Sequence, residues 1–188
     1  DGSPVALILG DNLLHGNELI TSILNANKRE YGANIFAYRV NDPNRYGIVE
    51  FDKNNKVLSI EEKPKKPKSK YAIIGLYYYD NSVVEKTKTI NLSARGELEI
   101  SAINQIYLKE NKLYAEILGR GIAWFDTGTT DSLYEASGYV RSLQNRQGLM
   151  IGSPEEIAWR NNWISTKKLL KVASIFSGSD YGKYLRKL

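Results

Sequence analysis

The sequence contains no cysteine and only one histidine, His15. Without cysteine the chain has no disulfide framework, no thiol nucleophile and no thiolate metal ligand. A single histidine excludes a metal site built from several histidines, and its place beside Gly16 suits a surface or helix-capping position. The lack of cysteine is compatible with a reducing compartment, and we expect a cytoplasmic protein.

Long hydrophobic runs are missing as well. No apolar stretch approaches the roughly 20 residues that span a bilayer. The first four residues lack the basic start and the apolar centre of a signal peptide. We therefore expect no membrane partner and no secretion.

The composition that is present indicates a globular protein with some attraction to phosphate. Hydrophobic residues make up 42% and charged residues 25% of the 188 residues, which excludes a disordered or fibrous chain. This length suits one main domain with a core and a small appendage. The net charge of +5 favours phosphate groups, either in a polynucleotide or in a small ligand.

The pattern of hydrophobic residues predicts an α/β fold. The first apolar run, residues 5–9, has no alternation, which is typical of a strand buried on both faces in the centre of a parallel sheet. A helix over 17–30 and a strand over 34–40 complete a strand-helix-strand unit with a right-handed crossover. Hairpin spacing then predicts an antiparallel portion. Further strands are expected at 46–51, 57–62, 71–79, 113–118 and 122–125, and further helices at 81–87, 96–109, 133–143, 154–163, 166–174 and 180–188.

Two aspartates are candidates for chemistry because each follows an apolar strand. Asp11 ends the run 5–9, and Asp126 precedes a Thr-Gly turn. Ligands of open α/β sheets bind beyond the carboxyl ends of strands, and two such carboxylates together suit Mg²⁺. Lys63, at a strand end, could neutralise a phosphate, and Glu62 could accept hydrogen bonds from sugar hydroxyls. Each piece taken singly also has a plainer explanation, as a turn, a helix cap or a solvated strand edge.

Several motifs occur in a fixed order along the chain. They are Leu9-Gly10-Asp11-Asn12, Arg45-Tyr46-Gly47-Ile48-Val49-Glu50, Glu61-Glu62-Lys63-Pro64-Lys65, Gly75-Leu76-Tyr77, Arg95-Gly96-Glu97-Leu98-Glu99-Ile100, Gly119-Arg120-Gly121 and Trp124-Phe125-Asp126-Thr127-Gly128-Thr129. Together they resemble the sugar nucleotidyltransferase family, the sugar-nucleotide pyrophosphorylases. The tail Glu155-Glu156-Ile157-Ala158-Trp159-Arg160 narrows the resemblance to the bacterial glucose-1-phosphate thymidylyltransferases.

This resemblance implies a fold and a reaction. The fold is a Rossmann-like, mixed and mainly parallel sheet flanked by helices, of the nucleotide-diphospho-sugar transferase type. The reaction is Mg²⁺-dependent nucleotidyl transfer from dTTP to glucose 1-phosphate, giving dTDP-glucose and pyrophosphate for dTDP-rhamnose and surface polysaccharide. The family's glycine-rich nucleotide loop, Gly-Gly-x-Gly-Thr-Arg-Leu, does not occur in this sequence. The chain therefore resembles the C-terminal two-thirds of such an enzyme, and we expect it to be inactive alone.

The resemblance also implies roles for individual residues. Asp11 and Asp126 would hold Mg²⁺, and Lys63 would complete the catalytic set by binding the sugar phosphate. Gly75 is an isolated glycine in a strand, which marks a bulge or a close approach to the backbone, and here the ligand would touch it. The implied substrate-binding residues are Asn12, Tyr46, Gly47, Glu62, Lys63, Gly75, Tyr77, Arg95, Glu97 and Trp124.

The two ends of the chain are expected to differ in role. Residues 1–148 would form the sugar-phosphate- and metal-binding part, and residues 149–188 a helical appendage with regulatory and oligomer contacts. In the resembling enzymes a second site for dTDP-sugars lies between the subunits of a homotetramer and serves feedback inhibition. Arg120, Glu156 and Ile157 match positions that line this site. The tail equally suits an amphipathic helix that packs on the domain.

Two other hypotheses stay open. One is a non-catalytic fragment that binds a sugar phosphate or serves oligomerisation. The other is a basic nucleic-acid-binding module that uses the lysines of residues 63–70. Because these lysines lie in one proline-broken loop without a binding motif, a solvated loop and no nucleic-acid partner are favoured. The nucleobase is open as well, since thymine-selecting residues fall outside the matched motifs, and uridylyl transfer is an alternative.

Overall fold

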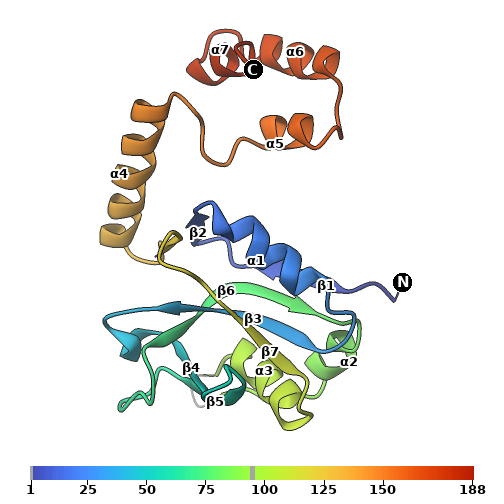
Figure 1. Ribbon diagram of the computed structural model, residues 1–188, viewed down its shortest axis with the longest axis vertical. Helices are drawn as coiled ribbons and strands as arrows, with labels where there is room; N and C mark the ends of the chain where they lie inside the picture. The colour runs from blue at the N-terminus through green and yellow to red at the C-terminus, as the bar shows by residue number, and fades with distance from the viewer. Residues whose placement is uncertain (1, 94–95) are drawn as a thin grey trace. The chain divides into compact units, whose positions relative to one another are not determined.

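The computed structural model describes residues 2–93 and 96–188 (Figure 1). The chain divides into two compact units, Asp1–Thr129 and Thr130–Leu188. The first unit contains the sheets, and the second consists of helices and their connections. The sequence analysis divided the chain by role, into a binding part over 1–148 and a regulatory part over 149–188. This division by role stays a prediction.

A six-stranded sheet, counted over the described residues, forms the centre of the first unit. Its strands are β1 (Val5–Ile8), β3 (Ala33–Arg39), β4 (Gly47–Phe51), β5 (Val57–Glu62), β6 (Tyr71–Tyr79) and β7 (Leu113–Ile117). The order is β5-β4-β6-β3-β7, with β1 also paired to β6. β3 and β7 pair in parallel, whereas β1, β3 and β4 each pair antiparallel with β6. β1, β3, β4 and β7 therefore run in one direction, and the predicted mixed α/β sheet is confirmed.

The sheet is organised around β6, because this strand changes partner along one of its edges. β1 pairs with residues 76–79 of β6, and β4 pairs with Tyr71 and Ala72. The opposite edge pairs with β3 along most of its length. The change of partner falls near Gly75, where Leu9 makes the last hydrogen bond of the β1 side, from its N–H to the Gly75 carbonyl at 2.8 Å. The candidate site lies at this change of partner.

Alternating side chains of the strands form two cores, one on each face of the sheet. Ile35 and Tyr77 belong to the core that packs against α2 (Val83–Thr87) and α3 (Ile100–Lys109). Their sequence neighbours Phe36 and Leu76 belong to the core on the other face, which packs against α1 (Glu18–Asn27). Figure 1 shows α1 on one side of the sheet and α2 and α3 on the other. Strands with two apolar faces require this covering of both sides.

A small two-stranded sheet accompanies the main one. β2 (Asn12–His15) and β8 (Ala123–Asp126) pair antiparallel, with Asn12 opposite Asp126. The strand over 122–125 was predicted. The strand at 12–15 was not, because it is short and its Gly-Asp-Asn start indicates a turn. This β2–β8 ribbon brings the residues that follow β1 next to the end of β8.

The prediction that the first apolar run is buried on both faces is wrong. Val5 and Leu7 are 38% and 39% exposed, and Ile8 is 58% exposed. β1 pairs with β6 along one edge, and no described strand pairs with its other edge. The run indicates a strand with two apolar faces, but its sequence contains no information about which segment covers them.

The second unit is built from four helices. They are α4 (Thr130–Gln147), α5 (Pro154–Arg160), α6 (Thr166–Ile175) and α7 (Asp180–Leu185). The predicted helices in the tail are therefore confirmed, with α5 and α7 ending earlier than expected. The buried core of this unit consists of Leu169, Ala173, Tyr184 and Leu185.

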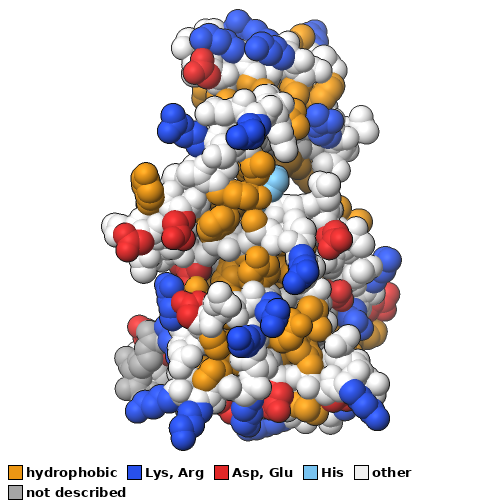
Figure 2. Space-filling model, turned by 60° about the vertical axis from the view of Figure 1, so that its left-hand side comes forward, with side chains coloured by type: hydrophobic (Ala, Val, Ile, Leu, Met, Phe, Trp, Pro, Cys, Tyr) orange, Lys and Arg blue, Asp and Glu red, His pale blue; other side chains and the backbone are white. Residues whose placement is uncertain are grey.

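Serine side chains set the starts of the last three helices. Ser153, Ser165 and Ser179 each accept a backbone N–H bond from the first turn of α5, α6 and α7, which is the usual N-cap arrangement. Figure 2 shows Lys and Arg side chains gathered over α6 and α7. The exposed members are Lys167, Lys168, Lys171, Lys183, Arg186 and Lys187. No helix in the described part of the chain is both long and apolar enough to cross a membrane.

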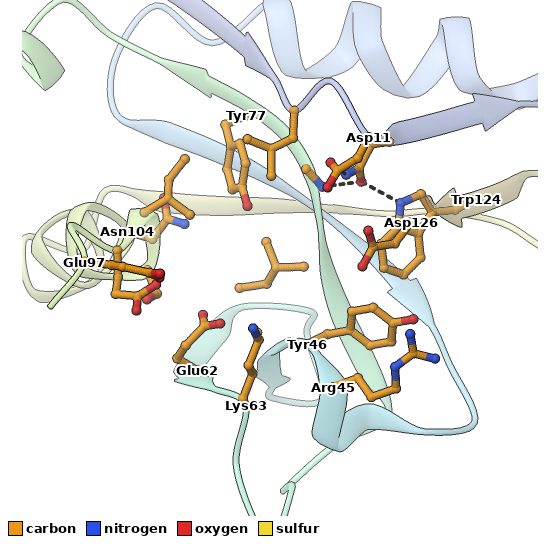
Figure 3. Close-up of a pocket in the computed structure, with 18 residues that line it drawn as sticks. Asp11, Arg45, Tyr46, Glu62, Lys63, Tyr77, Glu97, Asn104, Trp124 and Asp126 are labelled. Carbon is orange, nitrogen blue, oxygen red and sulfur yellow. Dashed lines mark hydrogen bonds between the residues drawn. The ribbon is translucent and has the colours of Figure 1, made fainter. Parts of the chain in front are cut away.

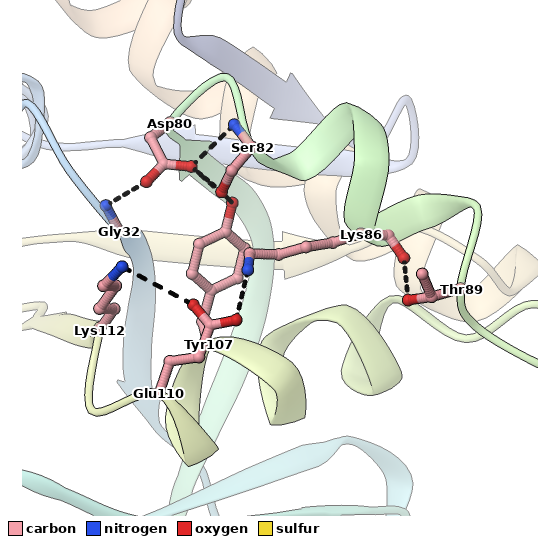
Figure 4. Close-up of polar contacts among 8 residues, drawn as sticks. All are labelled: Gly32, Asp80, Ser82, Lys86, Thr89, Tyr107, Glu110 and Lys112. Atoms are coloured by element: carbon pink, nitrogen blue, oxygen red, sulfur yellow. Dashed lines mark hydrogen bonds and ion pairs between the residues drawn. The ribbon is translucent and has the colours of Figure 1, made fainter.

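Asp80, the residue after β6, joins three elements of the first unit (Figure 4). Its carboxylate accepts hydrogen bonds from the Gly32 backbone at 2.6 Å, from the backbone and hydroxyl of Ser82, and from the Tyr107 phenol at 2.8 Å. Burial acts to raise the pKa of the Asp80 carboxyl. The hydrogen bonds outweigh burial, so the pKa lies below its usual value of 3.8.

We predict that Asp80→Asn lowers the free energy of unfolding at neutral pH by about 1 kcal/mol, because an amide oxygen accepts these bonds less strongly than a carboxylate. Since folding lowers the pKa, the carboxylate's contribution is present above pH 3.8 and is lost as the pH falls through the folded-state pKa. Urea denaturation should therefore show a smaller difference between wild type and variant in strong acid. Glu30→Gln, at an exposed position of the same unit, is the control. A difference that grows in acid would contradict this account.

Candidate functional site

A cavity of about 310 Å³ opens on the first unit where the partner of β6 changes from β1 to β4 (Figure 3). It contains all the predicted catalytic, metal and substrate residues that fall within the described part of the chain. Arg95 lies outside the described residues. The lining residues are Leu9, Asp11, Asn12, Arg45, Tyr46, Gly47, Glu62, Lys63, Ile73, Gly75, Tyr77, Glu97, Glu99, Ile100, Ser101, Asn104, Trp124 and Asp126.

β6 forms one side of the cavity. Ile73, Gly75 and Tyr77 alternate along the strand and therefore share a face. A Cβ at Gly75 would lie 2.7–2.9 Å from the amide atoms of Asn12, so only glycine leaves room for this side chain. The Asn12 Oδ1 accepts hydrogen bonds from the Gly75 N–H at 2.9 Å and from the Trp124 indole at 2.7 Å. The predicted close approach at Gly75 is made by Asn12, and contact of Gly75 with a ligand stays a prediction.

Asp11 and Asp126 lie close together although they are far apart in the sequence. Asp126 stands opposite Asn12 in the β2–β8 ribbon. The Asp11 carbonyl accepts hydrogen bonds from the backbone and the hydroxyl of Thr127, both at 2.8 Å. One oxygen of each carboxylate lies within 3.7 Å of the position that a Cβ would take at Gly128. The fold therefore brings the two predicted metal ligands to one place.

This carboxylate pair is a donor set that suits Mg²⁺. The ion prefers oxygen ligands, keeps several of its waters and is usually held by one or two carboxylates together with ligand phosphates. Among the described residues no group of three or more His, Cys, Asp or Glu is arranged to hold a metal. The pair is thus better suited to a hard cation shared with a ligand than to a cage of protein ligands.

Two positive charges face the same cavity. Lys63 enters it from the end of β5, with its ammonium group turned inward (Figure 3). Its φ of 42° is in the left-handed region, which is uncommon outside glycine and often found at functional sites. Arg45, which the sequence analysis did not select, bonds to Asp42 at 3.2 Å, and this bond raises the pKa of the guanidinium.

Tyr77 and Glu62 supply a donor and an acceptor. Tyr77 is 4% exposed, and burial followed by the charge of Glu62 raises the pKa of its phenol, which stays protonated at neutral pH. Glu62 stands opposite Gly47 in the β4–β5 pair. A Cβ at Gly47 would lie 3.2 Å from the Glu62 carboxylate, so a larger residue there would displace it. These groups suit a ligand that carries hydroxyls.

One wall of the cavity was largely missed by the sequence analysis. It comes from α3 and the residues just before it, namely Glu97, Glu99, Ile100, Ser101 and Asn104. Only Glu97 was predicted. Within α3, positions 100, 101 and 104 recur at the spacing of one helix face, and this periodicity was the signal that could have identified these three residues. Glu99 precedes the helix and carries no such signal.

The predicted regulatory residues lie in different units. Arg120 lines a separate cavity of about 600 Å³ in the first unit, together with Arg39. Glu156 and Ile157 belong to α5 in the second unit. The Glu156 carboxylate bonds to Arg160 at 2.7 Å, and Ile157 is 48% exposed. A shared regulatory site for these residues stays a prediction.

Comparisons with known proteins show the family to which the chain belongs. The family model for nucleotidyl transferase matches residues 1–142. The chain is 52% identical, over 98% of its length, to the glucose-1-phosphate thymidylyltransferase of Mycolicibacterium smegmatis. It is 50% identical, again over 98% of its length, to that of Neisseria meningitidis. The chain spans 64% of the length of both relatives.

Solved structures resemble the chain as well. A Bacillus anthracis protein assigned as a glucose-1-phosphate thymidylyltransferase, in complex with a sucrose, is 36% identical with a TM-score of 0.66, over 81% of this chain and 58% of that chain. A UDP-glucose pyrophosphorylase complexed with UDP-glucose is 19% identical with a TM-score of 0.64, over 75% of this chain and 57% of that chain, and shows likeness of fold alone. Because the family model covers most of the sequence, the chain belongs to the nucleotidyl transferase family.

Proposed function

We propose that the chain is the sugar-phosphate- and metal-binding part of a glucose-1-phosphate thymidylyltransferase. The whole enzyme would transfer a nucleotidyl group from dTTP to glucose 1-phosphate and release pyrophosphate. The observation that carries this proposal is the meeting of Asp11, Asp126 and Lys63 at one cavity, from three distant segments. The curated relatives that bear this name, at 47–52% identity, support it.

The proposed reaction depends on positioning and charge. A phosphate oxygen of the sugar attacks the α-phosphorus of dTTP, and the bond from that phosphorus to the pyrophosphate oxygen breaks. All reacting groups are anionic, so neutralising and aligning them supplies most of the rate enhancement. Mg²⁺ held by Asp11 and Asp126 would add positive charge at the phosphate oxygens. The Lys63 ammonium would bind the sugar phosphate, and no covalent bond to the protein is needed.

The sugar would lie between polar and aromatic groups. The Tyr77 phenol would donate to a hydroxyl, and the Glu62 carboxylate would accept from others. Tyr46 and Trp124, whose ring centroids are 5.1 Å apart, offer apolar surface to the ring carbons. Asn12 holds the Trp124 indole in place through its Oδ1.

Regulation and assembly form a second part of the proposal. Feedback by dTDP-sugars at a site between the subunits of a homotetramer would use Arg120, Glu156 and Ile157. Arg120 supports this role because it shares its cavity with Arg39, and two guanidinium groups suit a diphosphate.

The nucleic-acid alternative has less support. Lys63 is turned into the cavity, and Lys68 is paired with Glu61 at 3.1 Å. Lys63 therefore faces the cavity, and Lys68 is engaged with a carboxylate of the protein itself. A continuous basic stripe, which polynucleotide binding favours, does not result from this arrangement.

We predict that Lys63→Ala weakens the binding of glucose 1-phosphate, measured by calorimetry, by about 10- to 150-fold. This corresponds to the loss of one charged hydrogen bond, about 1.5–3 kcal/mol. Lys66→Ala, at an exposed position of the neighbouring loop, is the matched control and should bind like wild type. Equal affinities for wild type and Lys63→Ala would remove the phosphate-binding role.

We also predict that Asp11→Asn and Asp126→Asn each weaken the binding of Mn²⁺, used as a spectroscopic probe for Mg²⁺, by roughly tenfold or more. Each substitution replaces an anionic ligand by a neutral amide and preserves its shape. Asp52→Asn, in the turn between β4 and β5, should leave the affinity unchanged. Electron paramagnetic resonance of free Mn²⁺ measures the Mn²⁺ affinity of each of the three variants. A loss of affinity in only one of the two site variants would argue against an ion shared by Asp11 and Asp126.

A further inference from the structure

Asn104 on α3 carries a polar group without a partner at the cavity wall. The residue is 1% exposed, and its Nδ2 is a buried side-chain nitrogen that makes no hydrogen bond. Asn104 lines the cavity, and Figure 3 shows its amide nitrogen turned toward the interior. Buried amide groups in folded proteins are normally satisfied, so this donor requires an explanation.

The Asn104 amide turns its oxygen toward the core. The Tyr79 phenol donates to the Asn104 Oδ1 at 2.8 Å. Tyr79 is itself held between the rings of Tyr77 and Tyr107, at centroid distances of 6.0 and 5.7 Å. Burial raises the pKa of the Tyr79 hydroxyl, which therefore remains a donor. Because the planar amide presents its oxygen to Tyr79, its Nδ2 is left on the side of the cavity.

We propose that the Asn104 Nδ2 donates a hydrogen bond to a hydroxyl oxygen of the hexose when the sugar phosphate binds. Asn104 would then discriminate between sugars that carry this hydroxyl and sugars that lack it. The inference rests on the proposed function, because it takes the ligand to be a hexose phosphate. An apolar side chain of the same shape would avoid the unpaired donor, and a bound hydroxyl satisfies it. A site with such a donor rejects the analogue that leaves it unpaired.

The test compares glucose 1-phosphate with its 2-, 3-, 4- and 6-deoxy analogues, each titrated into wild type and into Asn104→Leu. We expect one analogue to bind wild type roughly tenfold more weakly than glucose 1-phosphate does. Asn104→Leu should bind glucose 1-phosphate roughly tenfold more weakly and should no longer distinguish it from that analogue. This loss of discrimination is a result that a merely structural role of Asn104 does not produce.

Two further variants guard against effects of folding. Asn34→Leu is the matched control, because Asn34 is 2% exposed and also carries an unpaired amide atom, but it lies on β3 outside the cavity. It should leave the affinity and the discrimination unchanged. The double variant Tyr79→Phe with Asn104→Leu removes both partners of the buried bond. It should keep the thermal midpoint near that of wild type and still show the loss in affinity.

The outcomes separate this inference from the proposed function. If Lys63→Ala loses glucose 1-phosphate while Asn104→Leu keeps wild-type affinity and discrimination, the proposed function stands and the role of Asn104 is overturned. If Asn104→Leu weakens all five ligands equally, the role in discrimination is overturned as well. If wild type does not bind glucose 1-phosphate, both proposals fail together.

Discussion

The side chain of Asn12 is the contact on which the site depends. Its amide lies against the backbone of β6, accepts from the Gly75 N–H and the Trp124 indole, and donates to the Asp11 carboxylate at 2.9 Å. One planar group thus fixes the end of β1, the middle of β6 and the β2–β8 ribbon relative to one another. Because Asp126 is the register partner of Asn12, its position follows from the same contact. The absence of a side chain at Gly75 is what makes room for this arrangement.

The charges at the cavity indicate why a cation is part of the proposed function. Counted over the described lining, five carboxylates face two cations, Lys63 and Arg45. The net charge of +5 for the chain is therefore not concentrated here. A lining with this excess of negative charge repels a phosphate, whereas a divalent ion on the Asp11 and Asp126 pair would neutralise both of these carboxylates and weaken the repulsion. The Glu62 carboxylate, which also lines the cavity, is an acceptor that suits hydroxyls.

The positions of strands could be predicted from the sequence because they depend on local periodicity. The burial of a strand could not, because it depends on the neighbours of that strand in the fold. The strand over 71–79 and the strand over 57–62 agree with β6 and β5 because alternating and continuous apolar runs are local signals. The meeting of Asp11 with Asp126 followed from a general property of α/β sheets and from the family resemblance. The exposure of β1 could not be predicted, since burial depends on what packs against a strand. Arg45 and Asn104 were missed because an arginine near a turn and an asparagine on a helix are common without any function.

The wall formed by α3 is held by two phenols, and this links stability to recognition. Asn104 and Tyr107 are three residues apart and so share a face of the helix. Tyr79, the last residue of β6, binds the first of them, and Asp80, the residue after it, binds the second. The Lys86 ammonium lies 4.8 Å from the centre of the Tyr107 ring and makes a cation–π contact with it.

Two successive residues at the end of β6 therefore fix one turn of α3 against the sheet. Asn104 is at one end of this turn, and its Nδ2 faces the cavity. A hydrogen-bond donor that must discriminate between hydroxyl groups has to be held within a few tenths of an ångström, and a helix anchored at two points provides this rigidity. The buried tyrosines, which in the sequence look like ordinary core residues, are thus the elements that give the cavity wall its geometry.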